Sequence, residues 1–157
     1  MRISSFMMST ALVLGLALTS GGCGAGFDAA TPPGFLELEE PGDYDYRATT
    51  ADGLVIAARE LDNPSNGELS FWSQAIANEL RANAYALLAT RSIRSKDGVR
   101  GTELRFGHDR GTASHLYYVA LFVTPSKLCL LEIGGTKALV SEHEQEIAWT
   151  YAQFAVD

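Results

Sequence analysis

The sequence predicts an α+β protein, an α/β/α sandwich in which a mainly antiparallel central sheet is flanked by helices. Three observations predict this class. Alternating strand patterns broken by Gly-containing turns indicate hairpins at 44–60 and 85–111. A nearly continuous apolar run at 115–135 indicates central strands covered on both faces. Helical spacing of apolar residues at 69–87 and 137–154 supplies the flanking helices.

The first hairpin, at 44–60, reads "YDYRATTADGLVIAARE". Its tyrosines alternate with charged residues, Asp52-Gly53 is a favoured tight-turn pair, and "LVIA" resumes an apolar strand. The break "DNPSNG" ends this sheet pattern. The helix that follows has a polar outer face and is expected to lie on the sheet, and its apolar stripe consists of Leu69, Trp72, Ile76, Leu80, Ala84 and Leu87.

The later strands lead into a second helix. Lys96-Asp97-Gly98 is the next hairpin turn, and "HLYYVALFVTPSKLCLLEIGG" is the strongest strand pair because it is rich in aromatic and β-branched residues. The turn at 124–127 divides this pair, and Gly134-Gly135 ends the sheet. The final helix is expected over 137–154, with a buried stripe formed by Val140, Ile147, Tyr151 and Phe154.

The N-terminus predicts export. One basic residue, Arg2, precedes an uncharged apolar run and then small residues, which is the layout of a bacterial secretory signal peptide over 1–22. Cys23 follows Gly21-Gly22 and is therefore the expected lipidation site, as in lipoprotein signals, although Ser20 stands where the usual pattern has Leu. A diacylglyceryl group carries two acyl chains, of which palmitate is a typical one, and two chains would hold the protein stably in a membrane. The alternative is an ordinary signal peptide, with Cys23 incidental or paired with Cys129.

Removal of 22 of the 157 residues leaves 135, enough for one domain with a single core. The Gly-, Pro- and acid-rich segment 23–42 is expected to be a flexible tether, and 43–157 the domain. Loss of Arg2 changes the net charge from −7 to −8, which opposes nucleic-acid binding. The residue after Cys23 is Gly24, whereas in enteric bacteria an Asp at that position retains lipoproteins at the inner membrane. A lipid-anchored location in the outer membrane, facing the periplasm, is therefore expected.

The histidines are the obvious candidates for chemistry. His108 and His115 flank a Gly-containing loop with Asp109 and Ser114, but residues this close in a turn usually point apart, so a surface hairpin is expected instead of a catalytic triad. His143 lies one helical turn from Glu146 on a solvated helix face. Cys129 is expected to be a buried small hydrophobe. The sequence therefore predicts no catalytic residue, no metal site and no cofactor.

One basic cluster opposes the acidic balance of the chain. "TRSIRSKDGVRG" contains Arg91, Arg94, Lys96 and Arg100, and Arg94 and Lys96 would project to the same face of a strand. The cluster is a candidate docking patch for an acidic partner. The alternative is an exposed sheet edge that charge protects against aggregation.

The order of these elements resembles the PsbP/DcrB-like superfamily over roughly 44–154. The resemblance rests on the hairpin ending in "ADG", on Asp97-Gly98 followed by Gly101 and Glu103 in "DGVRGTELRF", and on the paired strands of "LYYVALFVTPSKLCLLEIGG". It departs from the family in the last helix, which ends Gln153-Phe154 where Ser-Phe is usual. The resemblance implies docking onto other proteins and no shared catalytic motif.

Together these observations predict a lipid-anchored envelope lipoprotein, not an enzyme, that binds another envelope protein as an accessory or assembly factor. The alternative function is a periplasmic domain that binds a small molecule or lipid in a cavity between sheet and helix.

Overall fold

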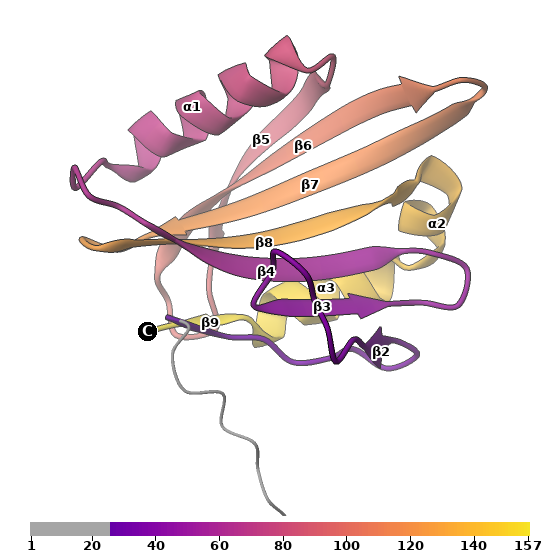
Figure 1. Ribbon diagram of the computed structural model, residues 1–157, viewed down its shortest axis with the longest axis horizontal. Helices are drawn as coiled ribbons and strands as arrows, with labels where there is room; N and C mark the ends of the chain where they lie inside the picture. Colours follow the sequence, from indigo (N-terminus) through magenta and orange to yellow (C-terminus); the bar gives the residue numbers. More distant parts are fainter. Residues whose placement is uncertain (1–25) are drawn as a thin grey trace, which may run out of the picture.

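The computed structural model describes residues 26–157. Its main sheet has seven strands in the order β2-β3-β4-β8-β7-β6-β5, and every neighbouring pair is antiparallel. The strands are β2 (Leu36–Glu37), β3 (Tyr46–Thr49), β4 (Val55–Asp62), β5 (Ala86–Arg94), β6 (Arg100–Arg110), β7 (Ala113–Val123) and β8 (Lys127–Thr136). The predicted α+β class with a mainly antiparallel sheet is confirmed (Figure 1).

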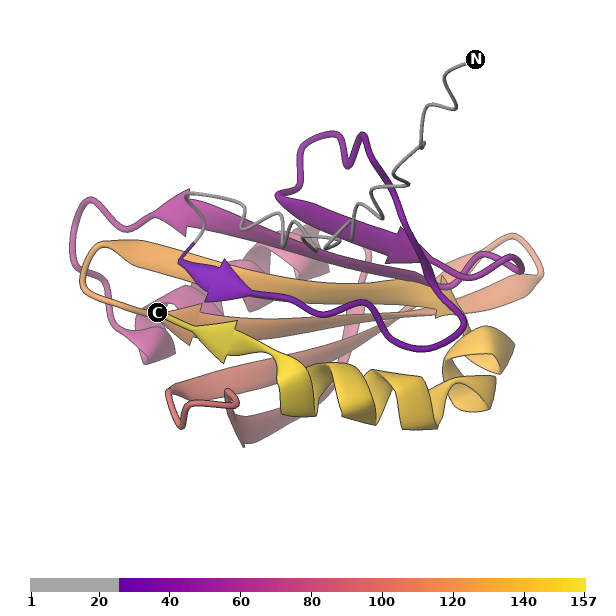
Figure 2. The ribbon, with the colours of Figure 1, turned by 90° about the horizontal axis from the view of Figure 1, so that it is seen from below.

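Helices cover both faces of this sheet. Helix α1 (Leu69–Ala82) lies on one face, and α2 (Lys137–Glu142) and α3 (Glu144–Gln153) lie on the other (Figures 1 and 2). Each face has its own apolar core, and strands β7 and β8 contribute alternate residues to both. These two strands are therefore covered on both sides, as their apolarity predicts.

Helix α1 ends five residues earlier than the apolar spacing predicts. Ala84 has a φ of 65°, and its N–H donates to the Arg81 carbonyl at 3.1 Å while that of Tyr85 donates to the Leu80 carbonyl at 3.0 Å. These two bonds form a Schellman motif, which ends a helix with a left-handed residue. Leu87 belongs to β5 but packs against the same core as α1, so its helical spacing was misleading.

The predicted final helix is divided into two. Thr136 caps α2, its Oγ1 accepting the Leu139 N–H at 3.3 Å, and His143 interrupts the helix before α3 begins. Val140, Ile147 and Phe154 are buried as predicted, whereas Tyr151 is only partly buried. Phe154 has an extended backbone beyond the end of α3, and its side chain closes the core.

The structure differs from the expected flexible tether over 23–42 in that residues 27–28 and 36–38 pair with strands of the domain (Figure 2). Strand β1 (Phe27–Asp28) pairs with β9 (Ala155–Val156), and the buried ring of Phe27 stacks on Phe154 at 5.3 Å between centroids. Burial of this aromatic side chain favours the attachment of the segment to the domain. The predicted signal peptide over 1–22 and Cys23 lie outside the described residues. Within 26–157, no helix is long and apolar enough to cross a membrane.

Candidate functional site

Strand β5 is the long open edge of the sheet, and it carries the predicted basic cluster. It pairs only with β6 among the described strands, and it contains a β-bulge between Leu87 and Ala89. Arg91 and Arg94 lie on β5, and Arg100 begins β6 directly opposite Arg94. The expectation that Arg94 and Lys96 share a strand face is wrong, because β5 ends at Arg94 and Lys96 lies in the turn.

The four cations of this cluster are exposed and weakly neutralised. Arg94 Nη1 donates to the Gly98 carbonyl at 2.9 Å, and Lys96 Nζ donates to Gln153 Oε1 at 3.3 Å. Arg91 Nε lies 3.9 Å from Glu103 Oε2. Among the described residues, this is the one ion pair that a cation of the cluster forms. The edge strand therefore retains a positive surface on a chain with a net charge of −7.

A buried carboxylate, Glu103, lies beside this edge. The sequence analysis predicted no ion-pair partner for it. Glu103 is 2 % exposed, and Arg105 binds it through two hydrogen bonds, Nε–Oε2 at 2.9 Å and Nη2–Oε1 at 3.0 Å. The Arg105 guanidinium also lies 4.4 Å from the centroid of the Tyr118 ring. Because side chains alternate along β6, Glu103 and Arg105 both point to the face that α3 covers. Their spacing of two residues was the signal in the sequence from which this ion pair could have been predicted.

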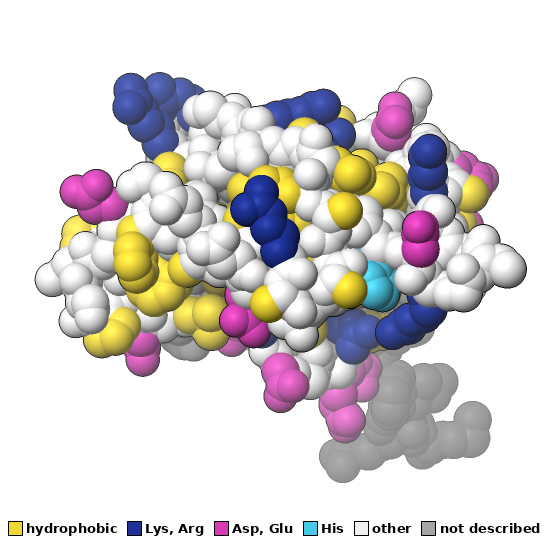
Figure 3. Space-filling view, turned by 90° about the horizontal axis from the view of Figure 1, so that it is seen from above, with side chains coloured by type: hydrophobic (Ala, Val, Ile, Leu, Met, Phe, Trp, Pro, Cys, Tyr) yellow, Lys and Arg dark blue, Asp and Glu magenta, His cyan; other side chains and the backbone are white. Residues whose placement is uncertain are grey.

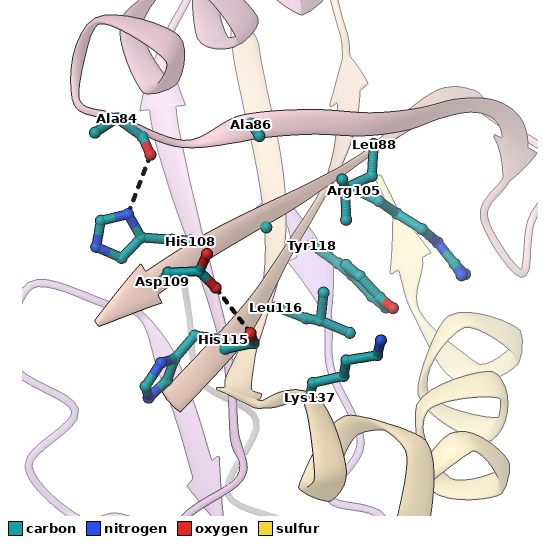
Figure 4. Close-up of a pocket in the computed structure, with 12 residues that line it drawn as sticks. Ala84, Ala86, Leu88, Arg105, His108, Asp109, His115, Leu116, Tyr118 and Lys137 are labelled. Carbon is teal, nitrogen blue, oxygen red and sulfur yellow. Dashed lines mark hydrogen bonds between the residues drawn. The ribbon is translucent and has the colours of Figure 1, made fainter. Parts of the chain in front are cut away.

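A groove of about 670 Å³ adjoins β5 on that face. Its apolar wall includes Leu88, which is 60 % exposed, together with Leu116 and Tyr118. Arg105 and Lys137 supply cationic groups beside the apolar wall (Figure 4). A chain that paired with β5 would place alternate side chains over this groove, because successive strand residues point to opposite faces.

The structure brings the loop histidines to the far end of this groove but does not assemble a triad. Ser114 Oγ donates to Asp109 Oδ1 at 2.8 Å (Figure 4). His108 Nδ1 lies 3.1 Å from the Ala84 carbonyl, and His115 Nδ1 lies 3.2 Å from the Ala113 carbonyl. A nucleophilic serine requires a histidine within hydrogen-bond reach, and here Ser114 bonds the carboxylate instead.

His143 connects two distant parts of the chain. Its Nε2 lies 3.5 Å from Asp52 Oδ2 in the first hairpin turn, and its Nδ1 lies 3.7 Å from Glu146 Oε2. The predicted proximity of His143 and Glu146 is thus observed. Residues 26–157 contain no group of three His, Cys, Asp or Glu side chains placed to hold a metal ion.

Cys129 is fully buried, as predicted, and its Sγ lies 3.4 Å from the Gly26 carbonyl. Burial raises the pKa of its thiol to about 11. Because the thiolate is the reactive form, we expect iodoacetamide at pH 8 to modify Cys129 at least about 100-fold more slowly in the folded protein than in urea. Peptide mass spectrometry of the full chain measures this rate separately from that of Cys23. Equal rates in both states would show that the β1 segment does not protect the thiol.

The arrangement of sheet and helices is found in known structures. LpqN, a protein involved in cell envelope biogenesis of Mycobacterium tuberculosis, has 12 % sequence identity and a TM-score of 0.67, over 83 % of this chain and 82 % of that one. Cyanobacterial PsbP (CyanoP) from Synechocystis sp. PCC 6803 has 13 % identity and a TM-score of 0.58, over 84 % and 87 % of the two chains. No family model and no curated protein sequence matches the chain. The domain has the PsbP/DcrB-like fold.

Proposed function

We propose that this protein is a lipid-anchored, non-catalytic accessory factor of the cell envelope that binds an extended acidic segment of another envelope protein along strand β5. The observation that carries the proposal is the open, basic edge of β5 with a groove beside it. Unpaired main-chain groups at a sheet edge bind an added strand, and neighbouring pockets select its alternate side chains.

Charge indicates which segment fits. Arg91, Arg94, Lys96 and Arg100 line the edge and its turn, and Lys137 stands at the groove. Lys137 forms no ion pair in the part of the chain that the structure describes. An acidic segment would therefore gain complementary charge, which speeds encounter and fixes register. Its apolar residues would cover Leu88.

Envelope anchoring rests on the sequence of the N-terminus. The apolar run, the small residues and Cys23 predict export and lipidation. The involvement of LpqN in cell envelope biogenesis supports this compartment for a domain of the same fold. An outer-membrane position facing the periplasm agrees with the absence of Asp after Cys23.

The test is photo-cross-linking in living cells, with a benzoyl-phenylalanine placed at Leu88 of the full chain. We expect one main cross-linked envelope protein, and we expect Arg91→Glu with Arg94→Glu to reduce that product about tenfold by removing complementary charge. Arg110→Glu, at an exposed hairpin end away from β5, is the matched control and should leave it unchanged.

The charge reversals on β5 decide whether its cations dock a partner or only protect the sheet edge against aggregation. A cross-linked product that does not respond to the β5 charge reversals would mean that Arg91 and Arg94 only prevent edge-to-edge aggregation.

Lipid anchoring has its own test. The Cys23→Ser form, fractionated in parallel, should leave the membrane or remain unprocessed. A fully processed form that stays on the membrane would contradict lipid anchoring.

A further inference from the structure

A second groove lies on the opposite face of the sheet, beside α1. Helix α1 packs mainly over strands β5, β6 and β7, and its side chains meet those of β4 and β8 along a groove at the border of the helix (Figure 1). The groove between α1 and these two strands has a volume of about 330 Å³ and an apolar lining that includes Leu61, Ile76, Leu80 and Leu130. Leu61 is 43 % exposed within it, and apolar side chains remain visible at the surface of this face (Figure 3).

The groove ends at a polar cluster. Glu132 is 3 % exposed, and it accepts hydrogen bonds from Tyr117 Oη at 2.6 Å and Tyr44 Oη at 3.1 Å. Arg59 Nη2 lies 2.8 Å from its other oxygen. Burial, followed by the nearby Glu132 charge, raises the pKa of Tyr117, so the phenol stays protonated and donates. Glu132 is thus engaged by two phenols at Oε2 and by the Arg59 ion pair at Oε1, and Oε1 has no further hydrogen-bond partner among the described residues.

A smaller cavity of about 140 Å³ continues from Glu132 and Tyr117 toward Arg47. Arg47, Ala57 and Glu132 are cross-strand neighbours in one row, and the small Ala57 leaves space between the two charges. Within residues 26–157, Arg47 forms no ion pair, and the buried Nε atoms of Arg47 and Arg59 have no hydrogen-bond partner. Buried polar atoms normally have a partner, so two donors here remain to be satisfied.

We infer that this groove binds an amphiphile with an acidic head group, a carboxylate or a phosphate, whose head contacts Arg47 and Arg59 and whose acyl chain lies along α1. The cluster of Arg47, Arg59 and Glu132 has one positive charge in excess, which an acidic head neutralises. Charge-assisted hydrogen bonds from arginine to such groups are the stronger kind. The other carboxylate at the groove, Glu79, lies on α1, where its Oε1 is 3.4 Å from Asn83 Nδ2.

The shape of the site fits an acyl chain. Ligand sites are usually apolar clefts with a few convergent polar groups, and this one combines an apolar channel with a polar end. It lies on the face of the sheet opposite the groove at β5, so partner docking and amphiphile binding can succeed or fail independently. Glu79 lines the larger groove but not the smaller cavity that Arg47 lines, so the head group is expected at the sheet and not at the helix.

Photoaffinity labelling of the full chain in neutral phospholipid nanodiscs tests the inference. The probe is a twelve-carbon fatty acid with a diazirine at its far end. We expect adducts on peptides from α1 and β8, and we expect unlabelled dodecanoate or dodecyl phosphate to compete, whereas dodecanol competes about tenfold less well because it has no charge for Arg47. The acid that competes at the lower concentration identifies a free fatty acid or a phosphate-bearing lipid as the source.

Matched variants separate the head site from the tail channel. Arg47→Gln should reduce labelling about tenfold, while Arg110→Gln should not. Ala75→Trp fills the groove and should abolish α1 adducts, while Ala82→Trp, exposed at the end of the same helix, should retain them. Adducts that persist in Ala75→Trp, or equal competition by dodecanol, would overturn the inference. Circular dichroism establishes that each variant is folded.

Discussion

Replacing Arg105 with Met will lower the free energy of unfolding by about 3 kcal/mol, because it leaves the buried carboxylate of Glu103 without its partner. Glu103 is 2 % exposed and is held by two hydrogen bonds from the Arg105 guanidinium. Methionine retains much of the side-chain length that packs beside Tyr118, so the loss is mainly electrostatic. Urea denaturation, followed by tryptophan fluorescence, measures the change.

Two further variants isolate the ion pair as the cause. Arg91→Met removes the more distant cation, 3.9 Å from Glu103 and 57 % exposed, and should cost less than about 1 kcal/mol. Glu103→Gln in the Arg105→Met background removes the unpaired charge and should recover most of the lost stability. If the double variant is as unstable as Arg105→Met alone, then packing of Arg105, and not its charge, stabilises this region.

Gly101→Ala is expected to cost about 2 to 3 kcal/mol, because an added Cβ has no space. That atom would lie 2.6 Å from two ring carbons of Phe122 and 2.8 Å from the Leu121 carbonyl oxygen. The Phe122 ring is 1 % exposed and stacks on Phe154 at 5.6 Å, and Phe154 stacks in turn on Phe27. Displacement of Phe122 would therefore disturb the core that connects the sheet to both ends of the described chain.

Gly107→Ala, in the same strand, is the matched control. The atoms nearest to its Cβ would all belong to Leu88, with Cδ1 at 3.3 Å, the end of a flexible and exposed side chain. Alanine also loses less backbone entropy than glycine in a strand, so this variant should be neutral or slightly stabilising. Equal melting temperatures for the two variants would show that the space around Gly101 is not restricted.

These two predictions explain why the spacing in "DGVRGTELRF" is informative. Asp97 Oδ1 accepts the Ser95 hydroxyl at 2.7 Å and the Val156 N–H at 3.0 Å, so the turn also holds β9. Gly101 makes room for Phe122, and Glu103 pairs with Arg105. Asp97, Gly101 and Glu103, which carry part of the resemblance, thus each have a packing or polar function in the fold.

Local patterns in the sequence were sufficient to predict those strands and turns whose conformation depends on neighbouring residues. The hairpin turns at Asp52-Gly53 and Asp97-Gly98 contain glycines with φ of 101° and 91°, as such turns require. The apolar run in β7 and β8 predicted central strands because only strands covered on both faces are apolar throughout. The predicted end of α1 was wrong because Leu87 has helical spacing but reaches the same core from β5.

By itself, the sequence determined the fold class, the central strands, the turns and the burial of Cys129, since these follow from hydrophobic periodicity and local backbone preference. Only the tertiary structure decided that residues 27–28 and 36–37 pair with strands of the domain, that Glu103 pairs with Arg105, and that Arg47 and Glu132 line one cavity beside an apolar groove. These features depend on contacts between strands far apart in the chain, and cross-strand register creates them. No local spacing records which distant side chain will lie opposite a given residue.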